Sequence, residues 1–122
     1  MNSLNKPFQD RSKEDLPIFI KWIDFVKWLL VTTEKFPKKT RFTFVDHLTR
    51  LSLLVVEDLV EARYSKSKKP LLKRINMNIE KIRVLLRICF ELKVLSRKSY
   101  EYGSRSINEV GKMLGGWLKQ QV

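Results

Sequence analysis

The sequence is poor in the residues that tight turns, crosslinks and metal sites require. Among its 122 residues are four glycines, four prolines, one cysteine and one histidine. So few glycines and prolines argue against an all-β fold, in which every short strand ends in a turn. A lone Cys89 cannot form an intrachain disulfide, and one Cys with one His cannot complete a structural metal site. We therefore expect a helical protein from a reducing compartment, with no metal or other cofactor.

Long hydrophobic runs are missing as well. The longest apolar runs have about five residues, whereas a membrane-spanning helix needs ~20. Residues 1–15 are polar and of mixed charge, without the apolar core of a signal peptide. We expect them to be a flexible segment ahead of a single domain formed by residues 16–122, in a cytoplasmic protein without a membrane partner.

Acidic residues are scarce in the second half of the chain. Residues 1–62 carry 10 basic and 9 acidic side chains, whereas residues 63–122 carry 15 basic and 4 acidic side chains. The net charge of +12 therefore comes almost wholly from the second half. Such a concentration of positive charge indicates an acidic partner, which could be nucleic acid, an acidic protein or a membrane surface.

Apolar residues recur at spacings of three and four in four segments, residues 16–34, 41–64, 70–93 and 97–121. This spacing is typical of amphipathic helices. Thr40 and Ser96 are expected to cap the second and fourth helices, and Pro70 suits the first turn of the third. Because the connections are short, the pattern predicts an all-α, antiparallel up-down four-helix bundle.

The third helix has a single apolar stripe, whereas the first helix has two. In the third helix the stripe consists of Leu72, Ile75, Ile79, Ile82, Leu86 and Cys89. In the first helix, one stripe consists of Phe19, Ile23, Val26 and Leu30. The second stripe, formed by Ile18, Trp22, Phe25 and Leu29, lies about 100° away around the helix axis. A bundle core needs only one stripe, so we expect the second to meet another copy of the chain; the alternative is a helix buried in a broad core. The expected interface residues are Ile18, Trp22, Phe25, Trp28 and Leu29.

A line of small residues follows the fourth helix, at Ser104, Asn108, Gly111 and Gly115. Each glycine inside a helix costs about 0.8–1.0 kcal/mol relative to alanine. We expect these residues to allow the close approach of another backbone.

Basic residues crowd the start of the third helix and continue along its surface. Cations at a helix N-terminus oppose the helix dipole, and a bound polyanion would relieve that repulsion. With few acidic residues to compensate, a binding surface is favoured over a merely solvated face. Membrane binding is disfavoured, because the apolar stripe of this helix is needed in the core. The candidate binding residues are Arg63, Lys66, Lys68, Lys69, Lys73, Arg74, Lys81, Arg83 and Arg87.

One spacing suggests catalysis. Arg41 and His47 form an R-x5-H pair, which resembles the motif of HEPN-type ribonucleases, where the two residues act together on RNA. The pair lies at the start of the second helix, whereas in that family the motif lies near the end of the bundle. We therefore favour a surface Arg and a partly buried His, and assign no catalytic residue.

Several stretches resemble one family. They are LLKRINMNIEKIRVLLRICFELKVLS (residues 71–96), INEVGKMLGGWLK (107–119), WLL…TEKFPK (28–38) and VEARYSK (60–66). Together they are similar to Avd, the accessory variability determinant of diversity-generating retroelements, across about residues 20–120. A related family is that of the four-helix bundles encoded in intervening sequences of ribosomal RNA genes.

The resemblance implies a homopentamer of four-helix bundles that binds the retroelement's reverse transcriptase together with RNA or DNA. It implies a non-catalytic role in mutagenic retrohoming, in which errors in a cDNA copy diversify a target gene. Lys73, Arg74, Arg83 and Arg87 stand at the family's basic motif positions. Two alternatives stay open: a HEPN-like ribonuclease, and a bundle that binds only a ribosomal or other protein.

Overall fold

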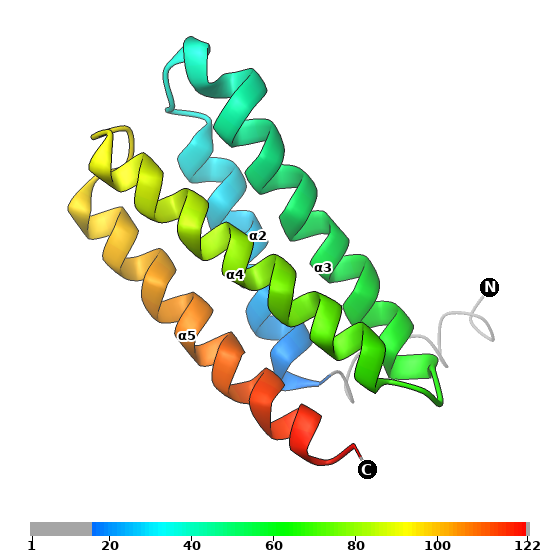
Figure 1. Ribbon diagram of the computed structural model, residues 1–122. Coiled ribbons are helices and arrows are strands. Elements are labelled where there is room, and N and C mark those ends of the chain that lie inside the picture. The colour runs from blue at the N-terminus through cyan, green and yellow to red at the C-terminus, as the bar shows by residue number, and fades with distance from the viewer. Residues whose placement is uncertain (1–15, 122) are drawn as a thin grey trace, which may run out of the picture.

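The computed structural model describes residues 16–121, and within them it contains four long helices and no strand. The expectation of a flexible segment at residues 1–15 lies outside this range. The helices are α2 (Pro17–Thr33), α3 (Asp46–Tyr64), α4 (Lys69–Glu91) and α5 (Arg97–Lys119). Figure 1 shows them running up and down side by side, and α2 packs on α3, α3 on α4, α4 on α5 and α5 on α2. The predicted all-α antiparallel bundle is confirmed.

The predicted stripe of α4 forms the centre of the core. Its six members are at most 1% exposed, so each supplies about 1.5–3 kcal/mol of transfer free energy if it is aliphatic and fully buried. Cys89 is the most polar of them, and burial raises the pKa of its thiol to about 11. The thiol therefore stays protonated at neutral pH and behaves as a small apolar side chain.

The second stripe of α2 is not available to another copy of the chain. Ile18, Trp22, Phe25 and Leu29 are at most 4% exposed within the single chain, and Trp28 is partly buried. The Trp22 indole donates a hydrogen bond to the carbonyl of Ser52 in α3, over 2.9 Å. Because α2 is covered by α3 on one side and α5 on the other, these residues are core residues, and their assignment to an oligomer interface is corrected.

The helix ends agree only in part with the sequence prediction. Ser96 caps α5 as predicted, since its hydroxyl accepts a hydrogen bond from the Ser99 amide. Thr40 does not cap α3, because its hydroxyl donates to the Pro37 carbonyl. A 3₁₀ turn, η1 (Lys38–Thr40), and a π-helical turn, η2 (Arg41–Val45), intervene. The regular α-helix therefore begins at Asp46, later than the apolar spacing suggested.

The glycines of α5 do not receive another backbone, contrary to the prediction. A Cβ at Gly103 would lie 2.7 Å from the Trp28 ring, whereas at Gly111 the nearest atom is the Arg83 guanidinium, at 4.0 Å. A Cβ at Gly115 or Gly116 would have no atom of the described residues within 4 Å, apart from the adjoining residues and the backbone of its own helix. The close approach is thus made by one indole ring on Gly103, and the later glycines lie along an open part of the helix surface.

This difference predicts opposite effects for the same substitution. Gly103→Ala forces the Trp28 ring to move within a packed core and should lower the free energy of unfolding by about 1–3 kcal/mol. Gly116→Ala places its methyl group against no other described side chain and should raise the free energy of unfolding by roughly 0.8–1 kcal/mol through helix propensity. Urea unfolding of both variants measures the difference. Equal effects at the two positions would show that Trp28 does not pack on Gly103.

Candidate nucleic-acid interface

Among the nine predicted basic residues are a first group whose charge the bundle uses internally and a second group that it leaves in solvent. Arg74 belongs to the first group. Its Nε and Nη2 each donate to one carboxylate oxygen of Asp58, both over 2.9 Å. Asp58 is 7% exposed, and this hydrogen-bonded pair raises the pKa of Arg74 above its ordinary value. The guanidinium therefore serves to neutralise a buried carboxylate between α3 and α4.

Lys68 also has a structural role. Its ammonium group donates to the carbonyls of Ala62, Arg63 and Ser65, over 2.7, 3.3 and 2.7 Å. These carbonyls lie at or just beyond the last turn of α3, where the helix dipole is negative and carbonyls lack intrahelical partners. The sequence interpretation, that Lys68 only opposes the dipole of the third helix, is therefore wrong: Lys68 stabilises the end of α3.

Arg83 and Arg87 have acidic neighbours that the sequence argument underrated. Arg83 pairs with Glu80 over 3.2 Å and donates a second hydrogen bond to Asn108 of α5. Arg87 pairs with Glu91 over 3.0 Å, and this hydrogen bond raises the pKa of Arg87. Exposed pairs of this kind contribute little to stability. Both arginines remain at the surface, but neither is an uncompensated charge.

The second group consists of Lys66, Lys69, Lys73 and Lys81. All four are exposed, and none has a hydrogen bond or ion pair to another described residue. Lys66 and Lys69 flank the start of α4, whose first turn contains no acidic residue. Arg63 is partly buried, and its guanidinium lies 5.9 Å from the ring centroid of Tyr64.

The fold adds a lysine to this group that the sequence argument missed. Arg83 of α4 touches Asn108 of α5, and the two antiparallel helices rise equally per residue. Ten residues earlier in α4, Lys73 therefore lies level with the end of α5, where Lys119 is exposed. The placement of Lys119 near Lys73 follows from the register of α4 and α5, and no local sequence motif encodes that register. We call Lys66, Lys69, Lys73 and Lys119 the basic end of the bundle.

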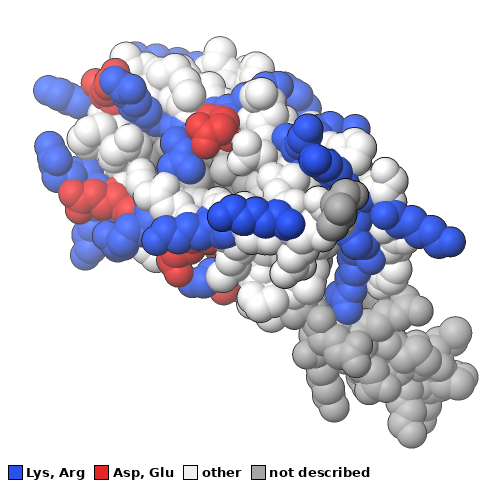
Figure 2. Space-filling model, turned by 60° about the horizontal axis from the view of Figure 1, so that its bottom comes forward, with Lys and Arg blue, Asp and Glu red and all other residues white. Residues whose placement is uncertain are grey.

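The space-filling view shows how the charge is distributed over one face. In Figure 2, Lys and Arg side chains reach across the visible surface and Asp and Glu are fewer, with uncharged surface between them. The excess of Lys and Arg over Asp and Glu in the sequence is thus visible on this face as extended cationic side chains.

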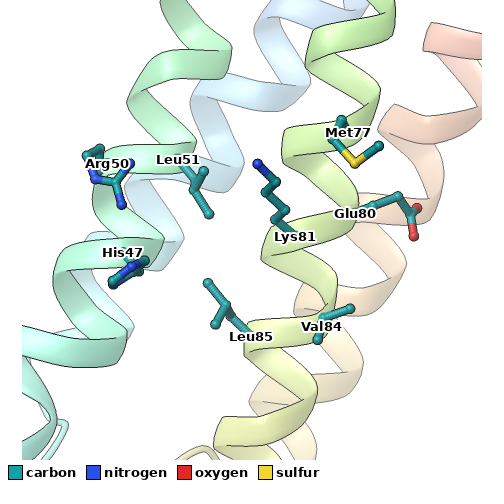
Figure 3. Close-up of a pocket in the computed structure, with 8 residues that line it drawn as sticks. All are labelled: His47, Arg50, Leu51, Met77, Glu80, Lys81, Val84 and Leu85. Carbon is teal, nitrogen blue, oxygen red and sulfur yellow. The ribbon is translucent and has the colours of Figure 1, made fainter.

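Lys81 lies apart from the basic end, in a groove between α3 and α4. The groove encloses about 510 Å³ and is mostly apolar. Figure 3 shows Lys81 extending from α4 toward α3, with His47 and Arg50 on the opposite side. The His47 Nδ1 lies 3.0 Å from the Thr43 carbonyl, and Arg41 is not among the lining residues. The groove therefore does not assemble the Arg41–His47 pair that a HEPN-type ribonuclease would need.

The described residues lack the features of two other classes of site. No group of three or more His, Cys, Asp or Glu side chains in this part of the chain is placed to hold a metal ion. Within the same residues, no helix combines the length and the apolarity needed to cross a bilayer.

The fold and this surface define a basic four-helix bundle. The family model described as bAvd-like matches residues 18–121, which is nearly the whole bundle, and the chain belongs to this family. It is therefore an accessory protein of the Avd type, as the sequence resemblance indicated. No curated protein matches the chain.

The division of the lysines predicts that two neighbours respond differently to one substitution. Lys68→Met removes three hydrogen bonds from the end of α3 and should lower the free energy of unfolding by about 1–3 kcal/mol. Lys69→Met removes a charge that has no ion pair with another described residue, and should change the free energy of unfolding by less than about 0.5 kcal/mol. Denaturant unfolding of both variants tests this. A neutral Lys68→Met would mean that the ammonium group does not cap α3.

Proposed function

We propose that the protein is a non-catalytic accessory factor of a diversity-generating retroelement, which holds reverse transcriptase and nucleic acid together during mutagenic retrohoming. Membership of the bAvd-like family across residues 18–121 carries this proposal. The surplus of cations on the surface supports it, because an accessory factor for cDNA synthesis must approach RNA or DNA. We place the protein in the cytoplasm, where the retroelement transcript and the enzyme are made.

The basic end of the bundle is the proposed contact for nucleic acid. Its lysines have no ion pair with another described residue, so binding a phosphate breaks no ion pair in this part of the chain. They lie around the start of α4, where backbone N–H groups lack intrahelical acceptors and the dipole is positive. Lysines that contact phosphates displace counterions from the nucleic acid and do not distinguish its bases. Binding is therefore expected to be independent of sequence and steeply dependent on salt.

Self-association would strengthen this attraction. A homopentamer, as in the Avd proteins that the sequence resembles, would carry a formal charge of +60, from five copies of +12 each. Charges summed over one particle create a long-range field that raises the rate of encounter with a polyanion. The same particle would present five basic ends, so weak single contacts would act together.

The experiment compares two triple variants with equal charge. Changing Lys66, Lys69 and Lys73 to Gln should weaken binding of a single-stranded RNA by roughly tenfold or more and reduce the slope of log K against log salt by about 2. The control changes Lys35, Lys38 and Lys39 to Gln. These lysines lie between α2 and α3, at the opposite end of the bundle in Figure 1, and the net charge falls to +9 in both variants. Fluorescence anisotropy at several salt concentrations gives both quantities.

The control decides between local and general attraction. Near-parental binding by the control with weak binding by the first variant supports the basic end. Equal loss in both variants would show that only net charge matters, and retention in both would refute a lysine-based interface. Circular dichroism should show both variants folded, because these side chains form no hydrogen bond or ion pair with another described residue.

The contact with reverse transcriptase needs its own measurement. The enzyme encoded by the same retroelement should co-purify with the parent protein after treatment with nuclease, which separates a protein contact from a shared RNA. Loss of the complex on nuclease treatment would reduce the role of the chain to nucleic-acid binding. RNA cleavage by the purified protein that disappears in His47→Ala would instead favour the ribonuclease alternative.

A further inference from the structure

The α3–α4 groove has an apolar surface that the bundle core does not use. In Figure 3, Leu51 and Leu85 point into the space between the two helices. At the edge of the groove, Met77 and Val84 of α4 are 57% and 54% exposed. Ile88, one turn beyond Val84 on the same face of the helix, is 36% exposed. The packing of the described residues therefore leaves an aliphatic strip open along α4.

Positive charge borders this groove on both sides. Arg50 of α3 and Lys81 of α4 line it, and neither has an ion pair with another described residue. Glu80 is the acidic residue of the lining, but Figure 3 shows its side chain directed away from α3, and its carboxylate accepts a hydrogen bond from Arg83. The groove thus combines an aliphatic floor with cations that form no ion pair among the described residues.

We propose that the α3–α4 groove binds an acidic amphipathic helix of the reverse transcriptase. This inference rests on the proposed function for the identity of the partner, and adds to it a site and a mode of binding. Aliphatic side chains of the partner helix, spaced at i, i+3, i+4 and i+7, would cover Met77 and Val84. Carboxylates beside them would pair with Arg50 and Lys81. From Met77 to Ile88, α4 rises by about 16 Å, which matches about three turns of a partner helix.

Charge and apolarity together select this occupant. A polynucleotide would pair with Arg50 and Lys81, but its sugar–phosphate backbone would lose water against Met77 and Val84 without forming new hydrogen bonds there. A second copy of the chain carries 25 basic and 13 acidic residues, so it would bring mostly like charge to the groove. A helix with carboxylates beside aliphatic residues matches both parts of the lining, and the charge pairs would fix its orientation.

The first test identifies the occupant directly. A photoreactive benzoylphenylalanine replaces Val84 in the full chain. In a control it replaces Val31, which is 60% exposed on α2 and lies outside the groove. Each protein is co-expressed with the reverse transcriptase of the same retroelement and irradiated. Position 84 should crosslink to the enzyme and position 31 should not. Mass spectrometry should locate the crosslink in a segment with aliphatic residues at helical spacing and Asp or Glu beside them.

The identity of the crosslinked molecule decides the proposal. Crosslinks from position 84 to a second copy of the chain, or to RNA, would overturn it in favour of that occupant. Crosslinks to a basic segment of the enzyme would overturn the charge pairing. No crosslink from position 84, or equal crosslinking from positions 84 and 31, would show that the enzyme does not occupy the groove.

The second test measures what the lining contributes to binding. Val84→Glu and Lys81→Glu each bring a carboxylate against those of the partner helix, and each should weaken retention of the enzyme after nuclease treatment by roughly tenfold. Val84→Leu keeps the aliphatic surface and Val31→Glu adds the carboxylate elsewhere, so both should retain the enzyme like the parent. All four variants should keep the parental helical content, because these positions are exposed. They should also keep the parental mass in light scattering, and a lower mass for Val84→Glu would assign the groove to a contact between copies instead.

RNA binding by the same samples separates this site from the proposed function. Val84→Glu should bind RNA almost as the parent does, whereas the variant with Gln at Lys66, Lys69 and Lys73 should still retain the enzyme. If the parent and Val84→Glu hold the enzyme equally after nuclease treatment, the groove assignment is wrong and the proposed function stands. If the parent itself holds no enzyme, the enzyme contact of the proposed function fails and this site fails with it.

Discussion

Burial of the apolar stripe on α4 is the constraint on which the rest of the surface depends. Its six side chains are almost completely removed from water, which fixes the rotation of α4 about its own axis. Each buried aliphatic residue contributes about 1.5–3 kcal/mol, whereas each cation near the start of the helix costs about 0.3–1 kcal/mol against the dipole. The stripe therefore determines the orientation, and Lys69, Lys73 and Lys81 are directed to solvent as a consequence.

This balance separates lysines and arginines that are equivalent in the sequence. Arg74 and Lys68 satisfy a buried carboxylate and the carbonyls around the end of α3, so their charges are used within the bundle. Lys66, Lys69 and Lys73 have no such role among the described residues. A ligand that binds the first pair must compete with existing hydrogen bonds, whereas one that binds the second set replaces only water and counterions. The chain can thus carry a large positive charge without losing the fold that presents it.

The sequence predicted most of the fold, because period and burial are local properties of a helix. The stripes of α3, α4 and α5 fell where the spacing of three and four placed them, and Ser96 capped α5. The errors arose where a residue's role is set by a neighbour distant in the sequence. Two apolar stripes on α2 suggested a partner outside the chain, yet α3 and α5 cover one of them. The hydrogen-bond partners of Arg74 and Lys68 depend on which helices pair. The position of Lys119 at the same height along the bundle as Lys73 depends on the register of α4 and α5. Composition encodes neither the pairing nor the register.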